Sequence, residues 1–228
     1  MKKILKILLV IILAFIIAVA GLLLWQWKNV ESILMGVSQN SKQIEQKRNE
    51  NQETLVDNVN DYMDTPAREM TEEEIGQIER GETTAAEVYQ KIFEEKNKET
   101  ENTIPEQAVA NAKDKDRIIS QYMSELYRLQ NEYTAKAEAT IAQGASYYES
   151  IKKHPQDAAA RASTITKFTS VVRNLEKECD SKVESVIKNM RADLTAIGAD
   201  TSIIESVRAT YANEKQLKLS YYANKYLK

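Results

Sequence analysis

The chain has 228 residues, of which 6 are glycine and 3 are proline, well below the ~12% that these two residues make up in average proteins. Because β-sandwiches and barrels need a turn about every 8–12 residues, this scarcity excludes sheet-rich, collagen-like and Pro/Gly-rich disordered chains and indicates long helices. One histidine and one cysteine are too few for a His/Cys zinc site or a disulfide framework, and a net charge of −3 gives no reason to expect bulk nucleic-acid binding.

Residues 1–27 predict a transmembrane signal-anchor. Residues 7–25 read ILLVIILAFIIAVAGLLLW and contain no charged side chain. At 1.5 Å per residue they span about 28 Å, close to the hydrocarbon thickness of a bilayer. The side chains that we expect at the membrane interfaces are the basic residues before this segment and the two tryptophans at its end: Lys2, Lys3, Lys6, Trp25 and Trp27.

A cleaved signal peptide is the alternative interpretation. Residues 18–20 read Ala-Val-Ala, which is typical of a signal-peptidase site, and cleavage after Ala20 would leave Gly21 as the mature N-terminus. The apolar run continues through residues 22–25, beyond the ~7–15 residues of such peptides, and this favours the uncleaved anchor. Both interpretations export the rest of the chain. Basic residues are sparse between Lys28 and Lys42, so we expect a cytoplasmic N-terminus and an extracytoplasmic C-terminal domain at the cell membrane.

Three further segments follow the anchor. Residues 28–66 are expected to form a polar helical stalk or a spacer, and since residues 38–54 contain Ile44 as their one aliphatic side chain, their order stays open. Residues 67–101 predict an acidic αα-hairpin. Its signals are two capping boxes, Thr71 with Glu74 and Thr84 with Glu87, and a C′ glycine, Gly81. Its acidic excess suggests either a basic partner or cation, or a solvated face; the absence of a calcium-loop spacing favours the solvated face.

Residues 104–228 predict a long antiparallel helical bundle. Two apolar seams with steps of 3 and 4 are joined by a turn at His154-Pro155, the second helix ends at Gly198, and a third helix folds back. The seams are Ile119, Tyr122, Leu126, Leu129, Tyr133, Ala137, Ile141, Gly144, Tyr148 and Ile151, and then Ile165, Phe168, Val172, Leu175, Cys179, Val183, Val186, Met190, Leu194 and Ile197. The expected fold class is therefore all-α: a transmembrane helix, a short αα-hairpin, and an elongated, coiled-coil-like antiparallel hairpin or three-helix bundle.

The sequence contains no recognisable catalytic, cofactor-binding or metal-binding motif. His154 lies in the predicted turn, which favours a structural role, and no phosphate-binding glycine loop or nucleophile elbow is present. Cys179 lies on the second seam, where a buried inert thiol is the default, although an intermolecular disulfide is possible if that seam faces a second copy. We expect no cofactor and no metal.

The 11 tyrosines are the most unusual feature of the composition. They could form a surface that stacks on sugars or a partner, or they could fill half-buried seams, for which tyrosine is well suited. The candidate surface residues are Tyr147, Tyr148, Tyr211, Tyr221 and Tyr222. The basic residues of the last helix could dock on the acidic hairpin or on an anionic envelope polymer, or could simply suit a helix end: Arg208, Lys215, Lys218, Lys225 and Lys228.

Two strings show a resemblance to known proteins. TEEEIGQIERGETTAAEVYQKIFEE (71–95) resembles short hairpins built of an acidic helix, a Gly-Glu turn and a second helix. LEKECDSKVESVIKNM (175–190) with YANEKQLKLSYYANKYL (211–227) resembles the C-terminal part of uncharacterised, single-pass membrane-anchored helical proteins of Gram-positive-type bacteria. That resemblance implies a bacterial envelope location and no particular activity.

These patterns predict a non-enzymatic, single-pass envelope protein with an extracytoplasmic helical scaffold or interaction domain. Its expected partners are the lipid bilayer and a protein, either a second copy or another chain, that packs against its helices; nucleic acid is not expected. The alternative is a sensory or ligand-binding helical ectodomain that works with a membrane partner, because the predicted cytoplasmic segment has only about six residues.

Overall fold

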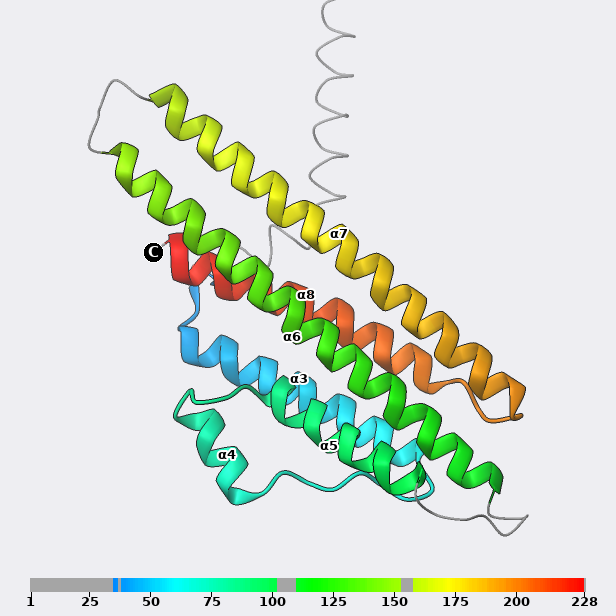
Figure 1. Ribbon diagram of the computed structural model, residues 1–228. Helices are drawn as coiled ribbons and strands as arrows, with labels where there is room; N and C mark the ends of the chain where they lie inside the picture. The colour runs from blue at the N-terminus through cyan, green and yellow to red at the C-terminus, as the bar shows by residue number, and fades with distance from the viewer. Residues whose placement is uncertain (1–34, 37, 102–109, 153–157, 228) are drawn as a thin grey trace, which may run out of the picture. The chain divides into compact units, whose positions relative to one another are not determined.

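The computed structural model describes residues 35–36, 38–101, 110–152 and 158–227, and every regular element within them is an α-helix (Figure 1). This confirms the predicted all-α class. The helices are α3 (Ser41–Tyr62), α4 (Glu72–Glu79), α5 (Ala85–Glu101), α6 (Ala110–Lys152), α7 (Ala158–Ala196) and α8 (Ile203–Leu227).

The chain divides into two compact units. Residues 55–207 form the central unit, which contains α4, α5, α6 and α7. Residues 1–54 and 208–228 form the terminal unit, whose described residues are 35–36, 38–54 and 208–227. Helices α3 and α8 contribute residues to both units.

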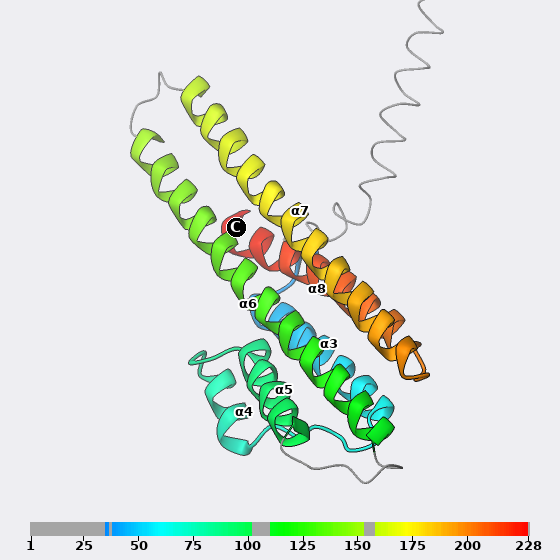
Figure 2. The same ribbon diagram turned by 45° about the vertical axis from the view of Figure 1, so that its right-hand side comes forward.

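Helices α6 and α7 pack as an antiparallel hairpin in the central unit (Figures 1 and 2). Tyr122 on α6 donates a hydrogen bond to Asp193 on α7, and Tyr133 donates one to Glu178, each over 2.6 Å. Because the partner's number falls as the number along α6 rises, the two helices run in opposite directions. The buried members of the predicted seams include Ile119, Tyr122, Leu129, Tyr133, Val183, Val186, Met190 and Leu194.

A second face of α6 packs against α5. The rings of Tyr89 and Phe93 on α5 stack on Tyr127, with centroids 5.6 and 6.0 Å apart, and Asn131 donates a hydrogen bond to Gln90 over 2.9 Å. Tyr127 is only 2% exposed. The first part of α6 therefore buries two faces, of which the predicted seam describes one.

Side-chain caps begin two helices as the sequence predicts. Thr71 Oγ1 accepts the N–H of Glu74 over 3.2 Å, and Glu74 Oε2 accepts the N–H of Thr71 over 2.8 Å. Thr84 and Glu87 make the same reciprocal pair at the start of α5. Left-handed glycines with φ +71° follow α4 and α7, the conformation that a helix C′ position favours in glycine: Gly81 and Gly198.

A buried carboxylate fastens the loop after α3 to α6. Asp116 accepts the backbone N–H groups of Asp64 and Thr65, each over 2.8 Å, and is only 2% exposed. Lys115 adds an ion pair with Asp64 over 2.9 Å. These bonds offset the cost of burying a charge and set where the chain enters α4 and α5.

In the terminal unit, α3 and α8 also run antiparallel. Arg48 pairs with Glu214 over 2.7 Å, and three residues later along α3 Asn51 donates to the carbonyl of Thr210. Residues 38–54 could have been a helix or a spacer by sequence. The structure has a helix from Ser41 onward, and Ile44 is fully buried in it.

The predicted membrane segment, residues 7–25, lies outside the described residues. Within the part of the chain that the structure describes, no helix combines the length and the apolar character needed to cross a membrane. The anchor therefore remains a prediction from the sequence.

Substitution of Gly144 tests the packing of α6 against α7. A Cβ at Gly144 would lie 2.8 Å from Cγ and 3.1 Å from Cδ1 of Phe168, which is too close for carbon atoms. Close approach of α6 and α7 therefore explains the glycine at this seam position. We expect Gly144→Ala to lower the free energy of unfolding by about 1–3 kcal/mol through overpacking, although alanine is otherwise the better helix former by about 1 kcal/mol. Urea unfolding followed by circular dichroism measures this change.

Gly76→Ala in α4 is the matched control. The nearest atom to its added Cβ is Nη1 of Arg80 at 3.0 Å, the end of a flexible, exposed side chain that can move away. We expect this substitution to raise stability by about 0.5–1 kcal/mol, the ordinary helix gain of alanine over glycine. Equal effects of the two substitutions would contradict the close contact at Gly144.

Candidate interaction surfaces

The predicted tyrosine surface is divided between the two units. Tyr147 and Tyr148 lie on α6 in the central unit, whereas Tyr211, Tyr221 and Tyr222 lie on α8 in the terminal unit. Tyr147 is 54% exposed, and the side chain of Tyr148 lies outside the described ones. A single surface made by all five tyrosines therefore remains a prediction, and each unit has to be considered by itself.

Tyrosines and lysines share one face of α8, which we call the lysine–tyrosine stripe. Five of its positions follow steps of 3 and 4, which place them on one side of a helix, and Tyr221 lies beside them, next to Tyr222. The stripe consists of Tyr211, Lys215, Lys218, Tyr221, Tyr222 and Lys225. The Nζ of Lys218 lies 5.6 Å from the ring centroid of Tyr221 and 5.7 Å from that of Tyr222. Lys225 lies 5.6 Å from the Tyr221 ring.

The rings of the stripe hold their lysines by cation–π attraction. Such contacts contribute about 0.5–1 kcal/mol at exposed sites, and Lys215 makes another with Tyr211 at 5.8 Å. Tyr221 and Tyr222 meet edge to face with centroids 5.6 Å apart. The ammonium groups are therefore held beside aromatic faces rather than ranging freely, which lowers the entropy cost of binding an anion.

Hydrogen bonds join the C-terminal end of the stripe to residues that precede α3. Asn224 Nδ2 donates to the carbonyls of Gly36 and Gln39, over 2.7 and 2.6 Å. On the neighbouring face of α8, Leu217 and Ser220 are buried. The C-terminal part of α8 is thus bonded to Gly36 and Gln39. Gly36 is nine positions after Trp27 in the sequence.

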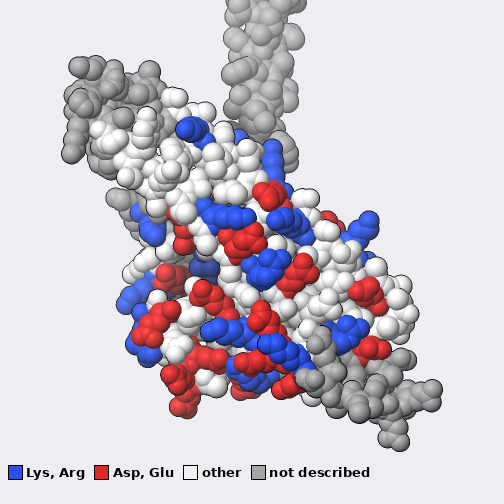
Figure 3. Space-filling model, viewed as in Figure 1, with Lys and Arg blue, Asp and Glu red and all other residues white. Residues whose placement is uncertain are grey.

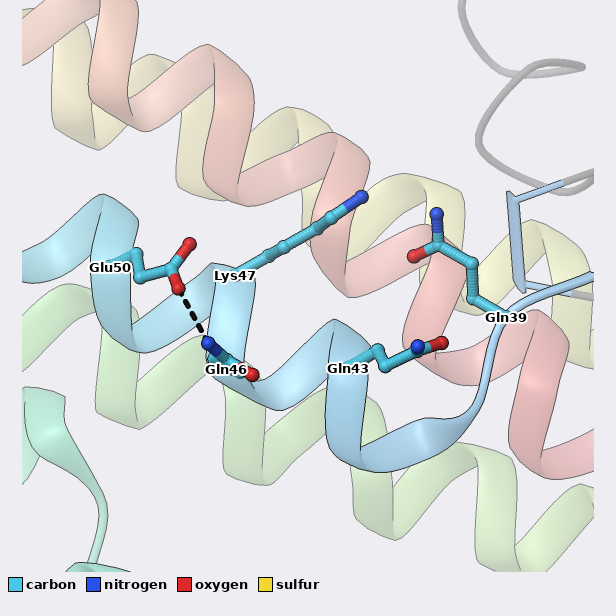
Figure 4. Close-up of a pocket in the computed structure, with 5 residues that line it drawn as sticks. All are labelled: Gln39, Gln43, Gln46, Lys47 and Glu50. Atoms are coloured by element: carbon cyan, nitrogen blue, oxygen red, sulfur yellow. Dashed lines mark hydrogen bonds between the residues drawn. The ribbon is translucent and has the colours of Figure 1, made fainter.

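A shallow hollow of about 250 Å³ lies along α3 in the terminal unit (Figure 4). Its lining is polar: Gln39, Gln43, Gln46, Lys47 and Glu50. Gln46 donates a hydrogen bond to Glu50 one turn away, over 2.8 Å. The hollow is smaller and more open than the apolar clefts of about 300–1,000 Å³ that usually bind small molecules.

The far half of the α6–α7 hairpin is nearly free of charge. We define this hairpin tip as residues 139–150 of α6 and 162–172 of α7, in which Glu149 and Lys167 are the only charged residues. Figure 3 shows mostly white surface on the part of the hairpin beside its grey end, whereas blue and red are closely mixed over α4 and α5. Tyr147 is 54% and Val171 is 40% exposed on this tip.

The acidic hairpin uses several of its carboxylates in its own structure. Arg68 bonds Glu74 through two nitrogens and Glu95 through Nε, all over 2.9 Å. The bonds from Arg68 hold the pKa of Glu74 at about 2, with help from Thr71. Among the described residues, no group of three or more acidic, histidine or cysteine side chains could hold a metal ion.

The remaining sequence candidates are separate from these surfaces. Cys179 lies half-buried on α7, and its role in an intermolecular disulfide stays a prediction. The membrane-interface residues lie outside the described part of the chain, as does His154: Lys2, Lys3, Lys6, Trp25 and Trp27. The lysine–tyrosine stripe could have been found from its spacing. The bonds of Asn224 join residues about 185 positions apart and leave no local signal in the sequence.

The pair between Arg68 and Glu74 predicts a pH-dependent contribution to stability. The pKa of Glu74 falls from its ordinary 4.5 to about 2 in the folded chain. The contribution is therefore present above about pH 4.5 and is lost as the pH falls toward 2. We expect Glu74→Gln to cost about 0.5–1 kcal/mol at pH 7, the usual value of an exposed ion pair, and the cost to vanish near pH 2. Urea unfolding at both pH values measures it.

Glu72→Gln is the matched control, because Glu72 lies in the same first turn of α4 and is exposed. It should change stability by less than Glu74→Gln at pH 7. A cost for Glu74→Gln that stays constant between pH 7 and pH 2 would contradict the role of the ion pair.

Comparison with known proteins yields no relative. The sequence matches no known protein family, and no curated protein or solved structure is significantly similar to it.

Proposed function

We propose that this chain is a non-enzymatic, single-pass membrane protein whose helices form an extracytoplasmic scaffold or interaction domain. Residues 7–25 supply the anchor, and α6 and α7 supply an elongated, coiled-coil-like antiparallel hairpin. Basic residues are more frequent before the membrane segment than just after it, and this supports a cytoplasmic N-terminus. The described residues add a surface suited to packing against another helix.

The hairpin tip is the observation that carries this proposal. Beyond Asn131, which bonds α5, helix α6 continues to Lys152 alongside α7 (Figure 2). Its seam there is lined by Gly144 and Phe168, and its outer face presents Tyr147 and Val171. A weakly charged surface with exposed tyrosine and aliphatic side chains resembles the centre of protein interfaces more than ordinary solvated surface.

A sensory or ligand-binding domain is the second candidate. The observation that favours it is the polar hollow along α3, from Gln39 to Glu50. This hollow presents amides, one ammonium and one carboxylate, so it suits a small polar ligand. We rank it below the scaffold because it is shallow and because no apolar surface encloses it.

Protease accessibility in intact cells tests the topology. A protease added outside the cell should digest residues 35–228, because the anchor places them beyond the membrane. The chain should at the same time stay with the membrane fraction after washing with alkaline carbonate. A protected C-terminal region would contradict the exported arrangement.

Photo-crosslinking tests the hairpin tip. A photoreactive amino acid at Val171 should give a covalent adduct in intact cells, either with a second copy or with another envelope protein, because this side chain lies on the proposed interface. The same probe at Lys188, an exposed position on the charged part of α7, is the matched control. Recovery of only the monomer from Val171, or equal adducts from both positions, would contradict the scaffold proposal.

A further inference from the structure

We propose that the lysine–tyrosine stripe of α8 binds the anionic phosphate headgroups of the membrane in which the chain is anchored. This inference rests on the proposed function, because it needs residues 7–25 to span the bilayer. The binding surface would be the C-terminal part of the stripe, from Lys215 to Lys225. The following observations, all within the terminal unit, carry it.

The first observation is position. Asn224 holds the end of α8 against the carbonyls of Gly36 and Gln39. Nine residues separate Gly36 from Trp27, the predicted end of the membrane segment. Even a fully extended chain spans at most about 3.6 Å per residue, so Gly36 stays within roughly 32 Å of the interface, and within about 14 Å if the connection is helical. This bound applies to the Asn224 end of the stripe, and a helical connection would bring that end closest to the headgroups.

The second observation is charge. The chain as a whole carries −3, yet the two segments at this end of the terminal unit, 38–47 and 215–227, contain five lysines and a single acid, Glu45. The lysines are Lys42, Lys47, Lys215, Lys218 and Lys225. Each lysine within a Debye length of about 8 Å from an anionic membrane shifts the binding equilibrium by roughly fivefold.

The third observation is the pairing of lysine with tyrosine. Lys218 lies over the rings of Tyr221 and Tyr222, and Lys225 lies over Tyr221. Tyrosine is enriched at the level of the headgroups, where one part of its ring is apolar and the other is wet. A lysine held beside such a ring is already oriented where a headgroup phosphate would meet it.

A membrane is favoured over a soluble anionic polymer as the ligand, because the anchor would tether the stripe to the membrane surface. The headgroups are present at a high effective concentration that a diffusing polymer does not share. The same anchoring means that weak individual contacts are sufficient, since the stripe does not have to recruit the chain to the membrane.

The test uses the full chain inserted in vesicles of phosphatidylcholine, with or without 30% phosphatidylglycerol. Hydrogen exchange of residues 215–227 is followed by mass spectrometry, and residues 175–190 of α7 serve as the internal reference. We expect exchange of residues 215–227 to slow by about fivefold or more in the anionic vesicles at low salt. The difference should disappear at 0.5 M salt because screening weakens headgroup attraction.

A charge-matched pair of variants separates the stripe from a general effect of charge. In the first variant, Lys215, Lys218 and Lys225 are replaced by Gln, and the difference between the two vesicle types should be lost. In the second, Lys91, Lys177 and Lys188 of the central unit are replaced by Gln, and the difference should remain. Circular dichroism checks that both variants keep their helices. If either variant loses them, the comparison of wild-type exchange in the two vesicle types decides the outcome alone.

Each negative outcome has its own meaning. A chain that resists carbonate washing but shows the same exchange in both vesicle types would overturn the headgroup proposal and leave the anchor standing. A chain that carbonate removes would overturn the anchor and the headgroup proposal together. Equal protection in neutral vesicles after addition of soluble polyphosphate would overturn the membrane as the ligand in favour of an anionic polymer.

Discussion

The burial of α6 on two faces is the constraint on which the central unit depends. The 43-residue helix α6 carries apolar side chains that have to be buried against other helices. Helices in proteins gain most of their stability from such packing. Helix α7 covers one face through its length, and α5 covers another through Tyr127. Tyr127 stacks on two rings of α5 at once, so this contact fixes α5 against α6.

Local features of this arrangement could be predicted, because their partners lie within one turn of chain. The capping boxes at Thr71 and Thr84 and the left-handed Gly81 and Gly198 are of this kind. The antiparallel seam was predictable as well, since a periodic apolar stripe that stops at a proline and resumes has few ways to be buried. The second buried face of α6 could not be predicted, because a tyrosine such as Tyr127 suits the surface as well as the core.

The candidate surfaces were predictable only in part. By sequence, Tyr147 could belong to a surface or to a half-buried seam, and in the structure it is 54% exposed. Its role in an interaction stays a prediction. The grouping of the tyrosines with lysines on α8 follows from their spacing, but the link from Asn224 to Gly36 joins two ends of the sequence. Asp116 is a similar case, because its carboxylate caps backbone groups about fifty residues away. Such contacts depend on the assembled fold, and single-sequence patterns do not encode them.

The acidic hairpin offsets part of its own charge with bonds inside the central unit. Glu74 and Glu95 bind Arg68, Glu82 binds Arg80, and Glu87 caps α5 through Thr84. The bonds from Arg68 lower the pKa of Glu74 to about 2, so this carboxylate stays ionised over the physiological pH range. Since these four glutamates serve the hairpin's own helix starts and ion pairs, the acidic excess of its sequence does not by itself indicate a basic partner or a cation.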